Sequence, residues 1–319
     1  MVIKTNPEFG IELALVVPYA YWLHENNQLD TVVTSKGMKP FYYFCSDVRE
    51  EFTFRNIDNS AAGLNDLPNN WIHHNSFYLT GKDYGSLSNS EKFNINGVLD
   101  YSKWKCPPYK NKYKNDEFTF NRPVVFITNI FNHPDPADKR YYHHIPIKGL
   151  YDIFTLLNDM GYDVIYKREN NKNASITYDQ NELLGKYNNS GIIANVESLG
   201  IISDYELVSY FSNVILFDDI LKNNPHYGYN EIQLKILANC EKYISVCGGS
   251  SILTSCFEGT NIIYVTQGKE LRDNYFGKNS YFRKLSNANI VPIIDNVDEI
   301  KFRGYHNTNK ILDAIRQEF

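Results

Sequence analysis

The sequence feature that most constrains the fold is the stretch 229–268, in which helical and strand patterns alternate. Apolar residues at helical spacing come first, and a short apolar run at 243–246 then suits a buried strand. A second apolar helix and a second strand, 262–265, follow. Strands that alternate with helices predict a parallel sheet, and therefore an α/β fold.

The turn at 248–251, which joins the first of these strands to its helix, has the chemistry of an anion site. It consists of Gly248, Gly249, Ser250 and Ser251. Backbone N–H groups and the positive end of a helix meet at such a turn, glycine admits a ligand close to the backbone, and serine adds donors. Small residues also pack well at any strand-to-helix turn, so a purely structural role is the alternative.

The β-α pattern occurs in two series, which predicts two Rossmann-like domains facing across a cleft. The first series has strands at 2–5, 31–34 and 41–44 and a long helix at 11–27, which Pro18 should kink or restart. The second has strands at 123–128, 162–166 and 214–217 and helices at 147–160 and 206–211, before the stretch at 229–268. We expect an N-terminal α/β domain at 1–120 and a C-terminal α/β domain at 121–305. A C-terminal helix at 306–319 would then be free to cross back to the first domain.

Polar residues follow the strands of the second series and should meet at one edge of its sheet. They are Asn129, Arg168, Asp218 and the turn at 248–251. Arg168 can bind a diphosphate in bidentate fashion. Each has an alternative role, because Asn129 can cap a turn, Arg168 can pair with Asp163 or Glu169 and Asp218 can cap a helix. Tyr229 and Glu231, at the start of the helix before the turn, complete the expected ligand site.

Carboxylates of the first series are candidates for a catalytic base. Glu12 stands in the first turn of the long helix, directly after a glycine-containing loop. The helix dipole alone also favours an acidic residue there. Asp47, with Glu50 and Glu51, follows the expected strand at 41–44 and competes for the same role; a solvated acidic loop is the alternative.

Composition and termini exclude several classes of protein. The chain has 319 residues and a net charge of -5, which argues against a nucleic-acid binder. Five cysteines without a CxxC pair favour reduced, buried thiols, and no signal peptide or membrane span is evident, so we expect a cytoplasmic protein. The adjacent pair His73 and His74 lacks a third ligand at zinc spacing, so no metal is expected. We also expect no cofactor.

The layout resembles that of GT-B glycosyltransferases, which have two α/β domains. The segment YNEIQLKILANCEKYISVCGGSSILTSCFEGTNIIYV is similar to their helix–strand–GG[SN]S–helix–strand element. The segment PVVFITN, followed by LLNDMGYDVIYKRE, resembles the opening of the C-terminal domain in glycosyltransferases of large DNA viruses, including chlorella viruses. The N-terminal FGIELALVVPYA is similar to a heptosyltransferase pattern, with Glu12 at the acidic position when the prolines are aligned and Gly10 one position early.

The resemblance implies a metal-independent, inverting transfer of a sugar from a nucleoside-diphosphate sugar to a glycan hydroxyl. The donor would bind the C-terminal domain as a co-substrate, with Arg168 and the turn at 248–251 on the departing diphosphate, and Glu12 would deprotonate the acceptor. A UDP-sugar such as UDP-xylose is the first expectation and GDP-fucose the second, in host cytoplasm if the chain is viral. A nucleotide-sugar epimerase and a non-catalytic nucleotide- or glycan-binding protein remain the alternatives.

Overall fold

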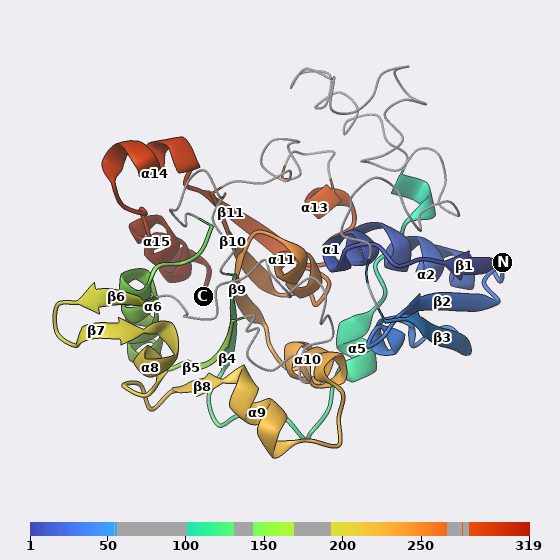
Figure 1. The fold of residues 1–319 in the computed structure, drawn as a ribbon, viewed down its shortest axis with the longest axis horizontal. Helices are drawn as coiled ribbons and strands as arrows, with labels where there is room; N and C mark the ends of the chain where they lie inside the picture. Colours follow the sequence, from blue (N-terminus) through green and yellow to red (C-terminus); the bar gives the residue numbers. More distant parts are fainter. Residues whose placement is uncertain (54, 56–100, 131–142, 169–192, 267–275, 277–280) are drawn as a thin grey trace.

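The computed structural model describes residues 1–53, 55, 101–130, 143–168, 193–266, 276 and 281–319. The chain forms an α/β structure with a three-stranded parallel sheet, a six-stranded parallel sheet and a two-stranded hairpin (Figure 1). The expected α/β class with parallel sheets is confirmed. The expected domain boundaries, and a cleft between two domains, stay predictions. The pair His73 and His74 lies outside the described residues.

The smaller sheet has the order β1-β2-β3 and belongs to the N-terminal part of the chain. Its strands are β1 (Val2–Lys4), β2 (Thr31–Ser35) and β3 (Asp47–Phe52). The first two were predicted, whereas the predicted strand at 41–44 is wrong, because residues 41–42 end a 3₁₀ helix, η2 (Lys39–Tyr42), and residues 43–44 form the turn after it. The third strand is a polar segment, DVREEF, with largely exposed side chains, so no apolar pattern marked it.

The first long helix restarts where the sequence predicted it would. It consists of α1 (Phe9–Ile11), a π-helical segment η1 (Glu12–Val16) and α2 (Val17–Glu25), with Pro18 in the first turn of α2. Proline lacks the N–H that would continue the hydrogen-bond ladder, so the preceding turn widens. The indole N–H of Trp104 donates to the Leu15 carbonyl in this widened turn, at 3.0 Å.

The larger sheet has the order β11-β10-β9-β4-β5-β8, with every neighbouring pair parallel. Its strands are β4 (Val124–Asn129), β5 (Asp163–Arg168), β8 (Val214–Leu216), β9 (Lys242–Val246), β10 (Thr260–Val265) and β11 (Asn289–Ile294). Numbered by their order along the chain they read 6-5-4-1-2-3, which is the Rossmann arrangement. The direction of winding therefore reverses between β4 and β9, and this switch point is where ligands bind in such sheets.

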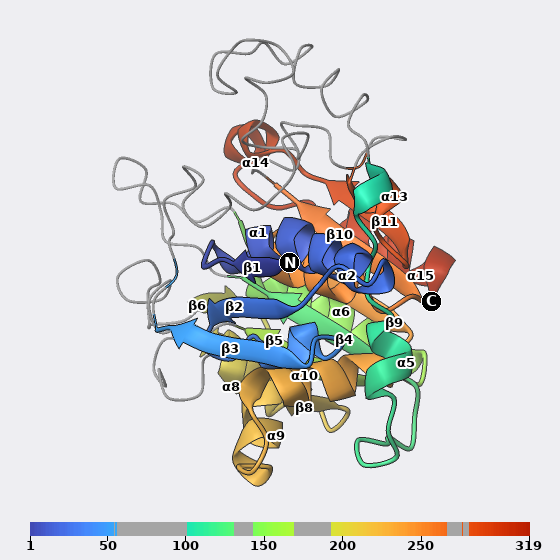
Figure 2. The same ribbon diagram turned by 90° about the vertical axis from the view of Figure 1, so that its right-hand side faces the viewer.

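Helices cover both faces of the larger sheet (Figures 1 and 2). On the face toward the smaller sheet lie α9 (Phe217–Asn223), α10 (Tyr229–Ala238) and α11 (Gly249–Thr254). On the other face lie α6 (Ile147–Asp159), α8 (Asp204–Val208) and α15 (Asn309–Glu318), and they cover the second apolar core. Helix α15 packs on α6, β10 and β11, so the structure does not place the C-terminal helix on the smaller sheet.

Several shorter elements complete the described structure. They are the hairpin β6 (Ile193–Val196) and β7 (Gly200–Ser203), and the helices α5 (Tyr109–Tyr113), α13 (Tyr281–Lys284) and α14 (Val297–Arg303), with a 3₁₀ turn, η4 (Tyr101–Lys103), ahead of α5. The hairpin packs near α6 and α8, away from the smaller sheet (Figure 1).

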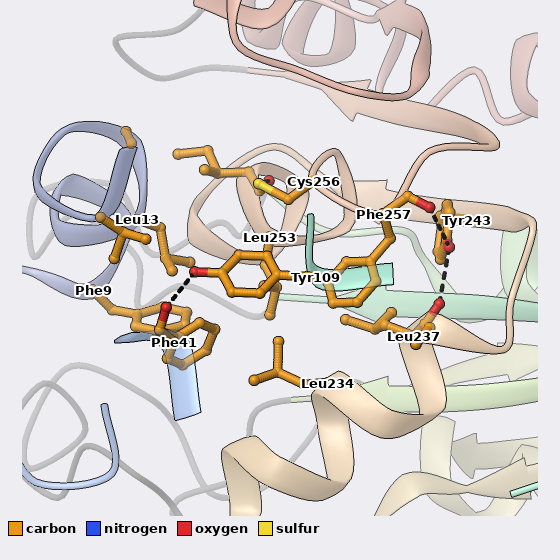
Figure 3. Packing of buried hydrophobic residues seen from close by; sticks show 14 of the residues in the cluster. Phe9, Leu13, Phe41, Tyr109, Leu234, Leu237, Tyr243, Leu253, Cys256 and Phe257 are labelled. Atoms are coloured by element: carbon orange, nitrogen blue, oxygen red, sulfur yellow. Dashed lines mark hydrogen bonds between the residues drawn. The ribbon is translucent and has the colours of Figure 1, made fainter. Parts of the chain in front are cut away.

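One hydrophobic core joins the two sheets (Figure 3). In the N-terminal part, Phe9 packs on Phe41, with ring centroids 5.7 Å apart, and Phe41 packs on Tyr109 of α5, at 6.0 Å. Tyr109 in turn stacks on Phe257, just after α11, at 5.8 Å, and its hydroxyl donates to the Phe41 carbonyl. Because the same aromatic rings serve both sheets, the position of α11 relative to α1 is fixed by packing.

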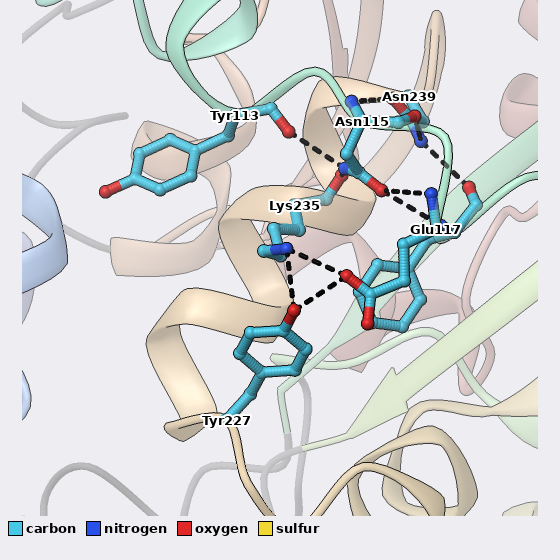
Figure 4. Close-up of polar contacts among 7 residues, drawn as sticks. Tyr113, Asn115, Glu117, Tyr227, Lys235 and Asn239 are labelled. Atoms are coloured by element: carbon cyan, nitrogen blue, oxygen red, sulfur yellow. Dashed lines mark hydrogen bonds and ion pairs between the residues drawn. The ribbon is translucent and has the colours of Figure 1, made fainter.

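The segment that joins the two parts of the chain is fastened to α10 (Figure 4). The Asn115 side chain donates to the Lys235 carbonyl at 3.0 Å, and the Asn239 side chain donates to the carbonyls of Asn115 and Phe118, both at 2.8 Å. Glu117 accepts from Lys235 at 2.8 Å. These contacts hold α10 in place, and with it the start of the helix, where Tyr229 stands.

Candidate functional site

The glycine-serine turn, residues 248–251, lies at the switch point of the larger sheet. It follows β9, and a Cβ atom at Gly248 would lie 3.0 Å from Cδ1 of Ile130, the residue that follows β4. Gly248 has φ 152°, a conformation that favours glycine. The structure therefore brings this turn to the ends of both strands at which the sheet reverses.

The turn is closed by its own hydrogen bonds. The Gly248 N–H donates to the Ser251 hydroxyl at 3.0 Å, and that hydroxyl donates to the Gly248 carbonyl at 2.7 Å. The N–H groups of Ser251 and Ile252 donate to the same carbonyl. Gly249 opens α11, so its N–H lies outside the hydrogen-bond ladder of that helix. The turn is thus a rigid backbone loop with a donor at its start.

Gly249 also touches the N-terminal part of the chain directly. A Cβ on Gly249 would lie 3.2 Å from Cδ1 of Phe9 and 3.3 Å from the Cα of Gly10, and a Cβ on Gly10 would lie 3.2 Å from the Cα of Gly249. The two backbones meet at this point because neither residue has a side chain. The turn at 248–251 therefore lies at the junction of the two sheets, beside α1 (Figures 1 and 2).

His143 is hydrogen-bonded to Cys247, the residue directly before the turn at 248–251. Its Nε2 lies 2.6 Å from the Cys247 carbonyl and its Nδ1 lies 2.9 Å from the Thr266 hydroxyl. Because the carbonyl can only accept, Nε2 carries the hydrogen and Nδ1 accepts from Thr266. Burial lowers the pKa of His143, which keeps the ring in this neutral form. The sequence offered no signal for this contact, whose partners are 104 residues apart.

Asn129 and Arg168 are paired in register at the ends of β4 and β5, so the predicted convergence of these two residues is confirmed. Asn129 is nevertheless used internally: its side chain donates to the Ile145 carbonyl at 3.0 Å and accepts from the Ile145 N–H at 2.9 Å. It therefore fixes the return of the chain into α6.

Arg168 is buried and paired with Asp204, whose Oδ2 lies 2.5 Å from Nε. The sequence predicted a carboxylate partner as an alternative, but with a different residue. The Tyr205 ring lies 4.5 Å from the guanidinium carbon, and its hydroxyl donates to Asp218 at 3.2 Å. Burial raises the pKa of Asp218. Arg168, Asp218 and Tyr205 thus form one cluster beyond β5 and β8.

Lys167 is a candidate site residue that the sequence did not indicate. It is 2% exposed, its Nζ donates to the Gln233 side chain at 2.6 Å, and the same atom lies 5.4 Å from the centre of the Tyr229 ring. Thr128, its register partner on β4, has a buried hydroxyl without a hydrogen-bond partner among the described residues. An ammonium group, an amide and a hydroxyl therefore meet beside the switch point, and α10 brings Tyr229 to them.

Glu231 is half-buried in the first turn of α10, on the side toward α5. Burial is the main cause that raises the pKa of Tyr113, and the charge of Glu231 raises it further. Asn230, between Tyr229 and Glu231, donates to the Gly37 carbonyl of the smaller sheet's β2–η2 connection at 2.8 Å. The start of α10 thus faces both sheets.

Glu12 is fully buried and held by three donors. Its Oε2 lies 2.5 Å from Nη1 of Arg55, and its Oε1 accepts from the hydroxyls of Tyr42, at 2.8 Å, and Thr34. Glu12 stands two residues after Gly10, so its segment is close to the turn at 248–251. The sequence predicted the position of Glu12 but did not indicate its contact with Arg55. The observed contacts are those of a buried ion pair.

Asp47 lies elsewhere. It is the first residue of β3, and because the strands of this sheet are parallel, it stands at the amino end of the sheet rather than at the carboxyl end. It pairs with Arg49 at 2.6 Å and accepts from the Thr31 hydroxyl at 2.9 Å. The prediction that Asp47 follows a strand and reaches the ligand edge depended on the wrong strand at 41–44.

No protein-family model and no curated protein sequence matches the chain. Among solved structures, the chain is similar to E. coli ADP-heptose lps heptosyltransferase II, with 10% identity, a TM-score of 0.48 and coverage of 99% of this chain and 96% of that chain. It is also similar to a glycosyl transferase family 9 protein from Veillonella parvula DSM 2008, with 8% identity, a TM-score of 0.44 and coverage of 95% and 87%. A third likeness is E. coli heptosyltransferase WaaC with ADP, with 11% identity, a TM-score of 0.36 and coverage of 91% and 73%.

Two further findings concern the described residues alone. They contain no group of three or more His, Cys, Asp or Glu residues placed to hold a metal ion. No helix among them is both long and apolar enough to span a membrane.

Proposed function

We propose that this protein is a metal-independent glycosyltransferase that takes its sugar from a nucleoside-diphosphate sugar. The observation that carries the proposal is the position of the turn at 248–251, at the switch point of a Rossmann-ordered sheet and in backbone contact with Gly10. A diphosphate bound there would lie at the junction of the two sheets, where an acceptor held by the N-terminal part can reach the sugar.

In this proposal the diphosphate charge is met by donors of the chain itself. The N–H of Gly249 and the hydroxyl of Ser250 belong to the turn, and the ammonium group of Lys167 is buried near the same strand ends. A charge in a site shielded from water is stabilised more strongly than on the surface, so these groups would favour departure of the diphosphate. Asp218 and Asp219 are adjacent and do not form the spaced Asp-x-Asp pair that holds a divalent metal on a nucleotide sugar, which is why we propose a metal-independent reaction.

The acceptor side has one proposed base, Glu12. Its carboxylate can take a proton from a glycan hydroxyl only after Arg55, Thr34 and Tyr42 have released it. The contacts favour a different role, in which Glu12 anchors α1 so that Gly10 meets Gly249. Replacement by Gln separates the two: a base would lose transfer and keep donor binding, whereas an anchor would lose both.

The identity of the donor sugar and its nucleotide is the most specific part of the proposal. The likeness of the C-terminal segments to viral glycosyltransferases favours a UDP-sugar, with UDP-xylose first and GDP-fucose second, and a glycan hydroxyl as acceptor. A thermal-shift screen with UDP-, GDP-, CMP- and ADP-sugars tests this, because at equal concentration a ligand that binds the folded protein more tightly raises the unfolding temperature further.

The fate of the bound sugar then decides the reaction class. NMR of a stabilising nucleotide sugar, with and without a mixture of glycan acceptors, should show a new glycosidic linkage only with acceptor. Formation of an epimer or of the free sugar from the donor alone would instead indicate an epimerase, and binding without any conversion would indicate a nucleotide-binding protein. No stabilisation by any nucleotide sugar would contradict the proposal.

A further inference from the structure

A cavity of about 360 Å³ lies on the face of the larger sheet away from the glycine-serine turn. One wall is the first turns of α6, with Lys148, Gly149 and Asp152, and the other is the segment 305–309, which leads into α15. Pockets of roughly 300–1000 Å³ are the usual size of small-molecule sites. The cavity belongs to different elements from those of the proposed donor site.

Buried contacts fix the second wall in place. Asp295, which is 0% exposed, accepts from the Asn307 N–H and from the Tyr264 hydroxyl, both at 2.8 Å, and pairs with Arg303. The Tyr264 hydroxyl also lies 2.9 Å from Nδ1 of His306. A buried carboxylate thus holds the segment 305–309 by its backbone and by its neighbours, and leaves the side chains of Asn307 and Asn309 available.

The two walls also touch each other closely. A Cβ atom on Gly149 would lie 2.5 Å from Cγ2 of Thr308. Glycine at this helical position costs about 1 kcal/mol relative to alanine, so the close approach is what requires it. The cavity is therefore bounded by two elements whose separation is set, and it is preformed.

The cavity wall carries several polar groups, and the charges of its acidic and basic side chains balance. Asp152 offers acceptors, Lys148 offers donors, and the amides of Asn307 and Asn309 offer both. Within the described part of the chain, no hydrogen bond uses the side chains of Asp152, Asn307 or Asn309. The first-turn N–H groups of α6 add donors, since no side chain caps this helix. Tyr305 is 62% exposed and supplies an aromatic ring, with the Arg303 guanidinium 5.6 Å from its centre.

We propose that this cavity binds an uncharged carbohydrate, with Tyr305 against a C–H face of the sugar ring and Asp152, Asn307 and Asn309 on its hydroxyls. Each hydroxyl of a sugar both donates and accepts, which suits amides and a carboxylate side by side. An anion such as phosphate is disfavoured because Asp152 offsets the charge of Lys148. Burial lowers the pKa of His306, so this ring adds no positive charge near neutral pH.

The test is saturation-transfer-difference NMR on the full chain. The probes are the methyl glycosides of xylose, glucose, galactose, mannose and fucose, with inorganic phosphate as the anionic probe, and each is measured with and without saturating UDP. We expect at least one glycoside to bind, with or without UDP. Tyr305→Ala and Asn307→Ala should each weaken that binding about tenfold, because each removes a principal contact.

Tyr210→Ala is the matched control, because Tyr210 is also largely exposed, at 56%, and does not line the cavity. It should bind the glycoside as the unmodified protein does, and unchanged unfolding temperatures would show that the variants fold. Absence of binding by every glycoside, equal binding by Tyr305→Ala, or displacement of the glycoside by UDP would overturn the proposal, and binding of phosphate alone would make the cavity an anion site. None of these results depends on whether the protein transfers sugars.

Discussion

At the scale of single residues, the buried ion pair of Glu12 and Arg55 can be tested most directly. Both side chains are almost completely shielded from water, at 0% and 1% exposure. Removing one partner of such a pair leaves the other charge buried without compensation. Removing one partner should therefore cost more stability than the attraction between the two charges contributes.

Glu12→Gln should lower the free energy of unfolding by about 3 to 5 kcal/mol, because the Arg55 charge stays buried. Glu51→Gln is the matched control, since Glu51 makes only an exposed pair with Lys4, at 3.4 Å, and its loss should cost about 1 kcal/mol or less. Urea unfolding of the three proteins measures both changes. Equal stability of Glu12→Gln and the unmodified protein would show that the carboxylate is not an anchor.

The residues of the candidate site were predictable from sequence only where a pattern marks them. Gly248, Asn129 and Arg168 follow apolar strand runs, so their place at a sheet edge follows from parallel topology. Lys167 reads as the end of a strand, and nothing in the sequence shows that Gln233, 66 residues away, accepts a hydrogen bond from it. Contacts between distant segments depend on packing that no local pattern encodes.

At the scale of elements, His143 and His144, which come shortly before α6, give the protein a pH dependence. Burial lowers the pKa of His143 and lowers that of His144 to about 3. The folded protein keeps these rings neutral, whereas the unfolded chain takes up protons near pH 6.5. Stability attributable to these histidines is therefore present above pH 6.5 and falls as the pH drops from there toward about 3.

We expect His144 alone to reduce the free energy of unfolding by about 2 kcal/mol between pH 7 and pH 5. The variant His144→Gln lacks this titration, so its stability should decline less steeply over the same range. Urea unfolding at half-unit steps of pH measures the two slopes. Equal slopes in the two proteins would be incompatible with a buried neutral ring. A gain in stability on acidification that is larger in the unmodified protein would be equally incompatible.

The contact between α6 and the segment before α15 makes a second prediction at this scale. Gly149→Ala would place a Cβ 2.5 Å from Thr308, so it should destabilise the protein by about 1 to 3 kcal/mol. Helix propensity acts in the opposite direction, by about 1 kcal/mol, so a fall in stability identifies the steric cause. Adding Thr308→Ala should restore part of the loss in thermal unfolding, and a double variant no more stable than Gly149→Ala would argue against this contact.

Elements were predicted well where an apolar run or a helical period was long. The strands and helices that were predicted between 123 and 265 fall within a few residues of their predicted places, and Pro18 marks the restart of the first helix. The hairpin β6–β7 and helix α9 in the same range were not predicted. The apolar run at 41–44 forms the end of a 3₁₀ helix and a turn instead, because Phe41 and Tyr42 pack into the core from a helix that begins at Lys39. Strand β3 was missed because it is a polar edge strand.

At the scale of the whole molecule, the alternation of strands and helices predicted an α/β protein with parallel sheets. The sequence did not indicate that one core would serve both sheets. Phe9, Tyr109 and Phe257 belong to one cluster that reaches from the smaller sheet to the larger one (Figure 3). The contact between Gly10 and Gly249 lies within the same junction.

Because of this shared core, we expect the chain to unfold in one cooperative transition. The calorimetric enthalpy should then equal the van't Hoff enthalpy, as for a two-state protein. Differential scanning calorimetry measures both. Two separate transitions would show that the parts at 1–120 and 121–319 unfold independently and that their packing is weak.

The central claim is that the turn at 248–251 binds a diphosphate, and isothermal titration calorimetry tests it most directly. UDP, GDP, ADP and CDP are titrated into the unmodified protein, into Gly249→Ala, and into Gly228→Ala as the control, since a Cβ on Gly228 meets no atom within 4 Å. We predict that at least one diphosphate binds, that the matching nucleoside without phosphates binds far more weakly, and that Gly249→Ala alone reduces diphosphate affinity about tenfold or more. Failure of all four diphosphates to bind, or equal affinity in Gly249→Ala, would contradict the account.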